Sequence, residues 1–328
     1  MTREVVLAAR PDGLPRESDF ALRDVSTPEP GEGQVLVRNV FVSVDPYMRS
    51  RMSGIRTYVD PYEVGGPIEG AAVGRVLVSR HEGLGEGDWV LSTLGWREQG
   101  VVDGDRVRRL DPDVAPPSTA LGVLGMPGLT AWVGLVDIGG VQAGETIYVS
   151  GAAGAVGSVA AQIAKLKGLE VIGSAGSAEK VAWLASLGIT AFDYRETVVR
   201  DALAGGIDVC FDNVGGAQLE AAIFALRPFG RVIACGAISR YNDERAEPGP
   251  RNLPLVVTKR LLLQGFIITD HFDRFPAFLA EVGPWVRDGS LRYRETIVDG
   301  IESLPSAFAG LFRGANIGKM LVRVGPDT

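Results

Sequence analysis

A glycine-rich turn between a strand and a helix is the feature that most constrains the fold of this chain. The apolar strand Thr146–Ser150 runs into residues 151–157, GAAGAVG, and a helical spacing of apolar residues follows. The turn matches the second and third glycines of G-x-G-x-x-G, and Ala152 replaces the first. Gly154 would let the backbone approach a pyrophosphate, and Gly157 would let the helix pack on the strand. Because a helix N-terminus favours phosphates, we expect a dinucleotide site; a glycine-rich turn without a ligand is the alternative.

Strand and helix patterns alternate from Thr146 to about Phe266. Such alternation predicts a parallel sheet with helices on both faces. Two of the predicted helices end at glycines, Gly168 and Gly188, which are typical of helix C-termini. The predicted strands are Thr146–Ser150, Glu170–Ala175, Ile207–Asp212 and Arg231–Cys235, and the predicted helices are Val156–Lys167, Glu179–Leu187, Gln218–Leu226 and Phe275–Val286.

The first part of the chain, to about residue 120, has a different pattern of apolar and turn residues. Short apolar runs such as Val35–Val42, Ala71–Val78 and Asp88–Leu91 are separated by turns rich in Gly and Pro. This pattern predicts an all-β, barrel-like lobe. The tail Lys319–Val324 reads as one more strand, which we expect to return to this lobe. A length of 328 residues fits about two domains of roughly 100–200 residues each.

Scarce residue types exclude several kinds of site. The chain has two cysteines, Cys210 and Cys235, and two histidines, His81 and His271. A four-cysteine zinc site is impossible, and a catalytic zinc would need these scattered residues to converge, so we expect no metal. No G-x-S-x-G motif indicates a serine hydrolase. We interpret both cysteines as inert core residues of interior strands.

Charge and apolar patterning bear on partners and location. A net charge of −7 argues against a nucleic-acid-binding protein, which usually has a basic face. No run approaches the ~18 apolar residues that a membrane span needs. Since Met1–Glu4 is followed by no long apolar core, we expect no signal peptide, no membrane association and a cytoplasmic location.

The residues around the second predicted strand favour NADP over NAD. An NAD site usually places an acid about 20 residues past the glycines, where it binds the ribose 2′-hydroxyl. Ser174–Ser177 contains no acid, whereas Ser177, Lys180 and Tyr194 can donate to a 2′-phosphate. Arg195 is a weaker candidate. The alternative for Lys180 is a solvated lysine on a helix face.

Topology predicts where further site residues lie. The carboxyl ends of parallel strands face the ligand in a doubly wound sheet. We therefore expect Ser150, Ser174, Asn213 and Cys235 near one edge. The polar stretch Arg240–Asn252 reads as a long surface loop, and loops of that length are often functional.

Seven short segments, in one order along the chain, carry a resemblance to a known family. They are Ser43–Arg49, Leu124–Ala131, Ala152–Ser158, Gly176–Lys180, Phe211–Gly216, Cys235–Ser239 with Tyr241 and Asn242, and Asn316–Lys319. The chain resembles zinc-independent medium-chain reductases of the leukotriene/prostaglandin reductase and alkenal double-bond reductase group, including bacterial curcumin reductases. The resemblance implies an α/β fold: a GroES-like β-barrel substrate domain, residues 1–120 and 297–328, plus a Rossmann doubly wound parallel sheet, residues 121–296, with the cofactor in the cleft between them.

The same resemblance implies an activity and a set of site residues. The activity is NADPH-dependent reduction of the C=C bond of small α,β-unsaturated aldehydes and ketones, by a homodimer joined through the edge strands of its Rossmann sheets. Lys180 and Tyr194 would bind the 2′-phosphate, and Met126 and Thr130 would flank the nicotinamide. The implied NADP(H)-binding residues are Met126, Thr130, Ala152, Gly154, Ala155, Val156, Gly157, Ser177, Lys180, Tyr194, Asn213, Cys235, Gly236 and Asn316, and the implied substrate-binding residues are Tyr47, Tyr58 and Tyr241. Without the resemblance, Met126 reads equally as a gap-filler, Thr130 as a helix cap and Asn213 as a turn former.

Tyr241 is the catalytic candidate. Hydride attack at the β-carbon drives negative charge onto the carbonyl oxygen, and a donor aimed at this oxygen is worth roughly 3–4 kcal/mol. A neutral phenol, with a reference pKa of about 10, suits that role. The α-carbon then takes a proton from Tyr241 or from water. The alternative role for Tyr241 is to pack within the loop that contains it. Tyr47, Met48, Tyr58 and Tyr62 are candidates to line an apolar pocket, with a core or loop role as the alternative for the last three.

Three functions are open at this point. The main hypothesis is an NADPH-dependent 2-alkenal or enone reductase. An NADPH-dependent quinone oxidoreductase on the same scaffold differs in substrate only. A non-catalytic NADPH-binding protein would bind the dinucleotide tightly and transfer no hydride.

Overall fold

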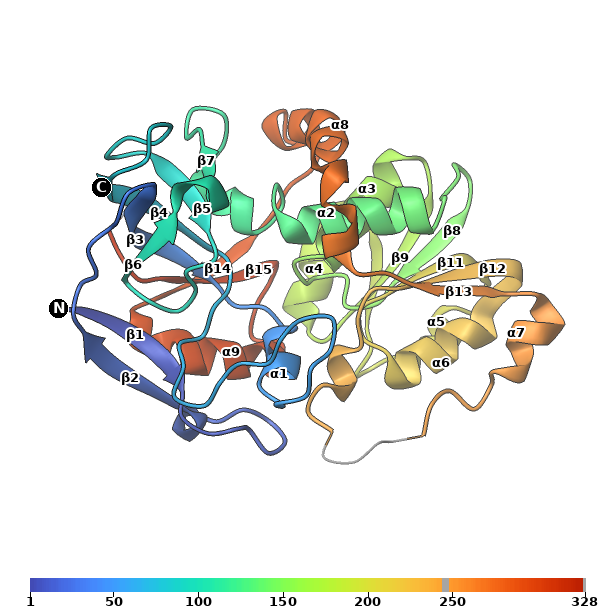
Figure 1. Cartoon of the computed structure of the whole chain (residues 1–328). Coiled ribbons are helices and arrows are strands. Elements are labelled where there is room, and N and C mark those ends of the chain that lie inside the picture. The colour runs from blue at the N-terminus through green and yellow to red at the C-terminus, as the bar shows by residue number, and fades with distance from the viewer. Residues whose placement is uncertain (244–247, 327–328) are drawn as a thin grey trace. The chain divides into compact units, whose positions relative to one another are not determined.

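Two units make up the chain. The computed structural model describes residues 1–243 and 248–326, so part of the predicted loop Arg240–Asn252 lies outside the described residues. One unit, here called unit 1, comprises Met1–Leu121 and Glu295–Thr328; the other, unit 2, comprises Gly122–Arg294. The colours of Figure 1 follow the chain from unit 1 through unit 2 and back to unit 1.

A six-stranded parallel sheet forms the centre of unit 2. Its strands lie in the order β10-β9-β8-β11-β12-β13, and every neighbouring pair is parallel. Counted from the first strand of the unit, this is the order 3-2-1-4-5-6 of Rossmann sheets that bind dinucleotides. The strands are β8 (Thr146–Val149), β9 (Glu170–Ala175), β10 (Thr190–Asp193), β11 (Ile207–Asp212), β12 (Leu226–Ala234) and β13 (Leu262–Gly265).

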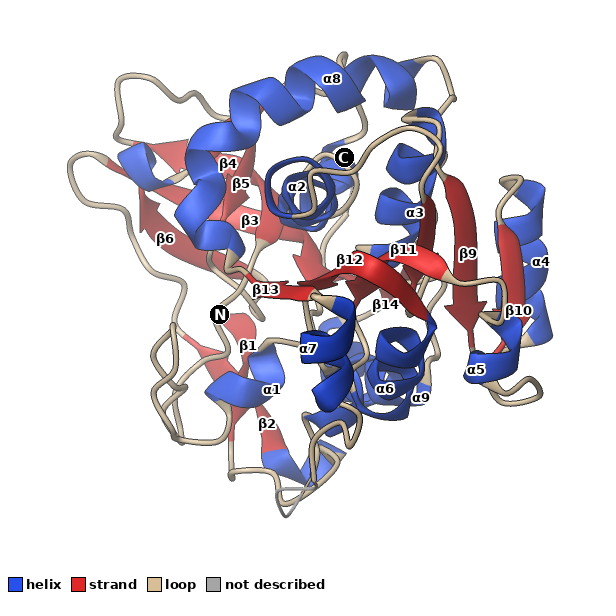
Figure 2. Cartoon of the chain, turned by 90° about the vertical axis from the view of Figure 1, so that its right-hand side faces the viewer, coloured by secondary structure: helices blue, strands red, loops and turns tan. Residues whose placement is uncertain are grey.

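Helices cover both faces of this sheet. Figures 1 and 2 show α2 and α3 on one face and α6 and α7 on the other. Ile147, Tyr148 and Val149 of β8 have no exposed surface at all, as expected for a strand covered on both sides. The predicted helix ends at Gly168 and Gly188 are confirmed, since both have positive φ, +84° and +70°. The helices are α2 (Met126–Val133), α3 (Gly157–Leu166), α4 (Ala178–Ser186), α5 (Val199–Ala202), α6 (Gly216–Ala225), α7 (Pro254–Lys259) and α8 (Phe275–Arg287).

Unit 1 is built on a mixed seven-stranded sheet and a two-stranded sheet. The larger sheet has the order β14-β15-β3-β4-β5-β7, and β6 pairs with the half of β3 that β15 leaves free. The tail strand β15 therefore returns to the first part of the chain, as predicted. The strands are β1 (Thr2–Leu7), β2 (Phe20–Val25), β3 (Gln34–Ser43), β4 (Ala72–Ser79), β5 (Trp89–Ser92), β6 (Gln99–Asp103), β7 (Arg108–Leu110), β14 (Glu295–Asp299) and β15 (Lys319–Arg323), and the helices are α1 (Met48–Arg51) and α9 (Leu304–Arg313).

An aromatic core holds unit 1 together. Phe20, Trp96 and Phe308 pack with ring centroids 5.5–6.2 Å apart. Met48 and Tyr62 belong to the same buried cluster, with 0% and 3% of their surface exposed. Of the roles that the sequence leaves open for Met48 and Tyr62, the structure shows the core role, because their side chains fill this cluster. The parallel sheet of unit 2 and the separate β-rich unit 1 confirm the expected α/β class.

Candidate active site

Four predicted residues lie where the strand order of unit 2 reverses. β8 has β9 on one side and β11 on the other, and β12 lies beyond β11. The predicted common edge is confirmed, because parallel pairing brings these carboxyl ends together. Open α/β sheets bind ligands at this reversal point. The residues at these strand ends are Ser150, Ser174, Asn213 and Cys235.

The glycine-rich turn is closely packed at one end and open at the other. A Cβ at Gly157 would lie 2.3 Å from the carbonyl oxygen of Gly151, so only glycine fits where α3 leaves the turn. A Cβ at Gly154 would meet that same oxygen alone, at 3.3 Å. Ala152, at the first glycine position, is buried and donates its N–H to Ser174 at 2.9 Å. In the first turn of α3, Ser158 and Ala160 donate to the carbonyls of Gly154 and Val156 at 3.0 and 2.9 Å, so the helix begins directly at the turn. The helix N-terminus and the open space at Gly154 together form a cradle that fits a diphosphate.

A buried carboxylate organises the loop after β11. Asp212 is 2% exposed and accepts hydrogen bonds from the Ser150 hydroxyl at 2.7 Å and from the N–H groups of Val214 and Gly215 at 3.0–3.2 Å. Burial raises the pKa of Asp212, and these donors oppose the rise. The Asp212 side chain therefore ties the strand that precedes the glycine turn to the loop that carries Asn213.

Asn213 is held in one orientation by the same strand end. Its backbone N–H donates to the Ser150 hydroxyl and its side-chain Nδ2 donates to the Ser150 carbonyl, both at 2.8 Å. Its own carbonyl accepts the N–H of Ile238 at 3.2 Å. Asn213 thus links the ends of β8 and β11 to the loop after β12. A side chain fixed in this way can present its amide to a ligand without a further loss of conformational freedom.

The predicted 2′-phosphate residues gather where β9 ends. Ser177 caps α4 and accepts the backbone N–H of Lys180 at 3.4 Å, so its hydroxyl proton can be donated elsewhere. Tyr194 donates its N–H to Ala175 at 3.0 Å. The Tyr194 hydroxyl lies 2.9 Å from the place that a Cβ at Gly176 would take. A Cβ at position 176 would therefore require the Tyr194 ring to move.

Positive charge is concentrated at this strand end. Lys180 is half-buried, and its burial, followed by the nearby charge of Arg195, lowers its pKa; Glu179 opposes this. The Arg195 guanidinium lies 5.9 Å from the Tyr194 ring centroid. Two cations in one place repel each other unless an anion binds there, and the strand end has no acid of the NAD type. The donor set therefore fits a 2′-phosphate.

Tyr241 follows a short 3₁₀ turn, Ile238–Arg240, after β12. Its phenol oxygen accepts the N–H of Ala237 at 3.2 Å, so its proton can be donated to another group. Burial raises the pKa of Tyr241, which keeps the phenol neutral near pH 7. Gly236 leaves room for this side chain, because a Cβ there would stand 3.2 Å from the hydroxyl.

Two other predictions for unit 2 can be compared with the structure. Cys235 follows β12, which ends at Ala234, and is only half-buried, so its interpretation as a core residue is wrong, while Cys210 is fully buried. Burial raises the pKa of Cys235 to about 12, which leaves the thiol protonated. Thr130 lies inside α2 and not at its cap; its hydroxyl donates to the carbonyl of Met126 at 2.8 Å. Toward a ligand Thr130 therefore acts as an acceptor.

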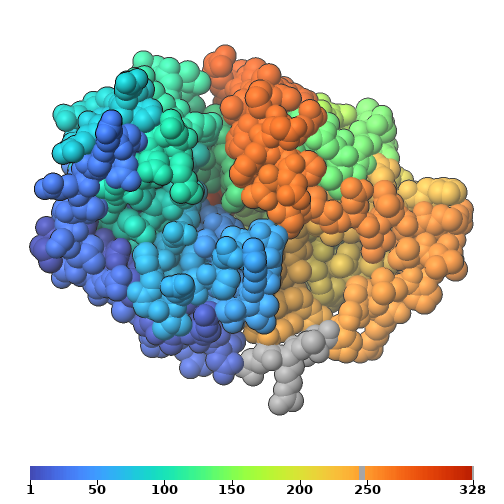
Figure 3. All heavy atoms as spheres, viewed as in Figure 1, coloured from blue at the N-terminus to red at the C-terminus, as the bar shows by residue number. Residues whose placement is uncertain are grey.

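The remaining predicted residues belong to unit 1. Tyr47 stands at the start of α1, and its burial raises its pKa well above the usual range. Tyr58 is 57% exposed, in the surface stretch between α1 and β4 that is light blue in Figure 3. Asn316 donates its side-chain N–H to Gly318 at 2.6 Å. Within unit 2 the structure thus joins Ser150 and Asn213 to the loop that leads to Tyr241, and it gathers Ser177, Lys180 and Tyr194 at the end of β9. Tyr47, Tyr58 and Asn316 lie in unit 1.

Comparison with known proteins gives the family. Residues 3–110 match a family model described as the N-terminal domain of oxidoreductase, and residues 155–283 match one described as zinc-binding dehydrogenase. The chain is 43% identical to the NADPH-dependent curcumin reductase of Escherichia coli, over 99% of this chain and 97% of that one. It is 40% identical to a 2-alkenal reductase (NADP(+)-dependent) of Nicotiana tabacum, over 98% and 97%. The crystal structure of CurA from Vibrio vulnificus in complex with NADPH matches with a TM-score of 0.94, at 39% identity over 99% of each chain.

The chain belongs to the alkenal and prostaglandin reductase group of the zinc-independent medium-chain reductases. In residues 1–243 and 248–326, this reductase has no group of three or more His, Cys, Asp or Glu side chains placed to hold a metal ion. Across the same residues, no helix has both the length and the apolar character to cross a membrane.

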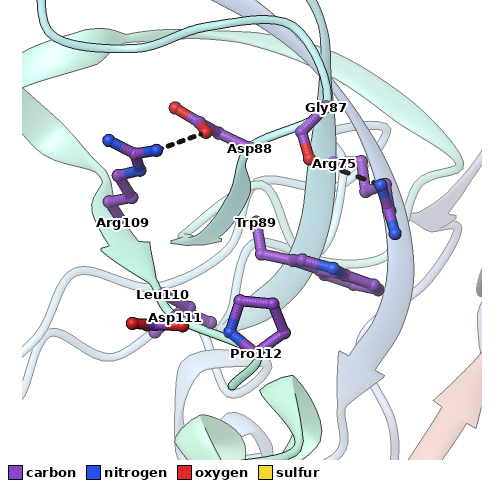
Figure 4. A pocket seen from close by; sticks show the side chains of 8 residues that line it. All are labelled: Arg75, Gly87, Asp88, Trp89, Arg109, Leu110, Asp111 and Pro112. Atoms are coloured by element: carbon purple, nitrogen blue, oxygen red, sulfur yellow. Dashed lines mark hydrogen bonds and ion pairs between the residues drawn. The ribbon is translucent and has the colours of Figure 1, made fainter. Parts of the chain in front are cut away.

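A hollow of about 660 Å³ on unit 1 of this reductase contains none of the predicted site residues. Figure 4 shows two of its charged side chains, Asp88 and Arg109, paired with each other at 2.8 Å. Arg75 stacks 4.7 Å from the Trp89 ring centroid and donates to the Gly87 carbonyl.

Sequence reasoning missed two buried charges of this reductase. Asp212 was read only as the end of an apolar strand, although an acid at a strand end beside Asn213 is the signal that points to its role. Lys319 was read as the first residue of a strand, and nothing in the apolar run Lys319–Val324 marks it as buried. Its 3% exposure follows from contacts distant in sequence.

Proposed function

We propose that this protein uses NADPH to reduce the C=C bond of α,β-unsaturated aldehydes and ketones. The observation that carries the proposal is the end of β9 beside the diphosphate cradle, where Ser174–Ser177 contains no acid and Lys180 and Arg195 lie close together, in a chain 43% identical to an NADPH-dependent curcumin reductase. We propose residues 121–296 as the NADP-binding domain and residues 1–120 with 297–328 as the substrate domain.

Each part of the cofactor has proposed partners. The turn Ala152–Gly157 holds the diphosphate, and Ser177, Lys180 and Tyr194 hold the 2′-phosphate, with Arg195 as a second cation. The geometry supports this assignment, since the turn is open at Gly154 and the donors stand at the end of β9. Met126, Thr130, Asn213, Cys235, Gly236 and Asn316 are the proposed residues for the nicotinamide half.

Tyr241 is the proposed donor to the substrate. When bound, NADPH supplies the hydride that the β-carbon receives. Negative charge then grows on the carbonyl oxygen, and the phenol proton of Tyr241 stabilises it, because the phenol oxygen accepts from Ala237 and its raised pKa keeps the proton in place. Tyr47 and Tyr58 are the proposed substrate-binding side chains of unit 1.

A panel of acceptors tests the proposed function. NADPH oxidation is followed with 2-alkenals, enones, quinones and saturated ketones, and the products are identified by mass spectrometry. We expect saturated aldehydes and ketones as the products of the alkenals and enones. Turnover of quinones much faster than that of any enone would replace the proposal with a quinone reductase, and tight NADPH binding without turnover would indicate a non-catalytic protein.

We further propose a homodimer, joined through β13. This strand is an edge of the parallel sheet, all four of its residues are exposed, and Leu262 and Leu263 are 50% and 38% exposed. An exposed apolar edge strand favours pairing with another chain. Light scattering of the purified protein tests the dimer, and a monomeric mass would reject it. The cytoplasmic location stays a prediction, which cell fractionation tests.

A further inference from the structure

Unit 1 contains a lysine that is almost completely buried. Lys319, the first residue of β15, is 3% exposed. Its Nζ donates to the carbonyls of Val44 and Met320, both at 2.8 Å, and lies 3.2 Å from Oδ1 of Asp45. Lysine is almost never fully buried without a partner, so these contacts account for its presence inside the unit.

Asp45 is the ionic partner of this lysine. It is 7% exposed, and its other carboxylate oxygen accepts a hydrogen bond from the Ser43 hydroxyl. Glu295 is the second acid near Lys319; burial raises the pKa of Glu295, and the charge of Lys319 opposes that rise. The Lys319 ammonium is thus bound by one carboxylate and two carbonyls on two segments far apart in the sequence.

A buried ion pair contributes little net stability to a fold. Removing two charges from water costs about as much as their attraction returns, and apolar pairs of similar volume are often as stable. Such a pair does fix geometry, because the ammonium and the carboxylate must keep the directions of their hydrogen bonds. The pair therefore fixes the relative position of the two segments that it joins.

The pair stands between two proposed site residues. Tyr47 follows Asp45 by two positions, and the carbonyl of Asp45 accepts the N–H of Met48 at 3.1 Å, which begins α1. On the other segment, Asn316 precedes Lys319 by three positions. Its turn is fixed to Thr296, whose hydroxyl accepts the N–H of Ile317 at 3.0 Å.

We propose that Lys319 and Asp45 are positioning residues, which hold Tyr47 and Asn316 in register for reduction of the enone. The inference rests on the proposed function, because it gives these two residues a purpose there. A displacement of about 1 Å at a reacting site costs on the order of 100-fold in rate, so loss of the Lys319–Asp45 ion pair should lower kcat/KM.

Three variants separate positioning from folding. Lys319→Met leaves Asp45 buried without its ionic partner and should lower Tm. The double variant Lys319→Met/Asp45→Asn removes both charges, and we expect it to recover the wild-type Tm. Arg323→Gln is the matched control: Arg323 lies on the same strand and pairs with Asp299 at 3.3 Å, but is 41% exposed. Tyr47 is observed directly by ¹⁹F NMR after 3-fluorotyrosine labelling, with its signal assigned by Tyr47→Phe.

We expect the double variant to melt near the wild-type temperature, to lose about 100-fold in kcat/KM for an enone and to show a shifted Tyr47 signal. Arg323→Gln should match the wild type in all three. A folded double variant with wild-type kcat/KM, or with an unshifted Tyr47 signal, overturns the proposal. A wild-type protein that reduces no enone refutes the proposed function, and the NMR comparison still decides whether Lys319 holds Tyr47.

Discussion

Replacing Lys180 by methionine should weaken the binding of NADPH and spare that of NADH. Methionine keeps the apolar stem of the lysine, so α4 and its Ser177 cap stay intact, and only the ammonium is lost. The two dinucleotides differ in the 2′-phosphate alone. A change confined to NADPH therefore reports on the end of β9.

The magnitude follows from the surroundings of Lys180. The side chain is half-buried, so its interaction with a phosphate is screened less than at the surface. A hydrogen bond to a charged group contributes about 1.5–3 kcal/mol net, which corresponds to about a 10- to 150-fold rise in the Kd for NADPH. Arg195 is exposed, so Arg195→Gln should cost about 0.2–1 kcal/mol, at most about fivefold.

Fluorescence titration of both dinucleotides, at low and high salt, measures these changes. Glu179→Gln is a matched control on the same helix; because it removes the one acid beside Lys180, NADPH should bind slightly more tightly. Equal losses for NADPH and NADH in Lys180→Met would show that the lysine shapes the helix and does not bind the phosphate. An unchanged NADPH affinity would refute the assignment of this strand end altogether.

Three further predictions test the rest of unit 2. Tyr241→Phe should lower kcat by about 10²–10³ with the NADPH Kd within twofold, measured by steady-state kinetics and titration; an unchanged kcat removes Tyr241 from the reaction. Gly157→Ala places a methyl 2.3 Å from the Gly151 oxygen and should lower Tm by about 2–12 °C by calorimetry, since overpacking costs about 1–3 kcal/mol; an unaltered Tm contradicts the packing role. Asp212→Asn should alter the pH dependence of stability: burial raises the folded pKa of Asp212 above its unfolded value, so the fold favours the protonated carboxyl, and the stability that this contributes below the unfolded pKa is lost as pH rises through the folded pKa. The Tm of the wild type should therefore fall relative to that of Asp212→Asn over that rise, and a Tm difference independent of pH contradicts it.

Much of unit 2 was predictable because its rules are local. Strand and helix patterns, glycines at helix ends and the strand-turn-helix at Gly157 each depend on a few neighbouring residues. Parallel topology then placed Ser150, Ser174, Asn213 and Cys235 at one edge without any further information. The start of β12 was missed, since the strand begins at Leu226, where its register with β11 is irregular.

Unit 1 was harder to predict because its core is assembled from distant segments. For Met48 and Tyr62 the sequence left open a pocket-lining role and a core role, and in the structure they belong to the cluster of Trp96 and Phe308. Which face of an irregular segment is buried depends on those partners, and no short pattern encodes them. The burial of Lys319 has the same cause, because its partner Asp45 is 274 positions away.

In each unit, a buried charge stands beside a proposed site residue and satisfies the hydrogen bonds of a loop. Asp212 accepts two loop N–H groups next to Asn213, and Lys319 donates to the carbonyl of Val44 near Tyr47. A strand that ends leaves backbone groups without a ladder partner, and a buried group left unpaired costs about 1–3 kcal/mol. If a loop held by such a charge shifts, its backbone N–H or C=O groups lose their hydrogen-bond partner. The loop therefore resists displacement more than a loop held by apolar contacts alone. The orientation of the proposed site residues is thus set by residues outside the proposed contacts, and substitutions at Asp212 and Lys319 should alter catalysis by displacing Asn213 and Tyr47.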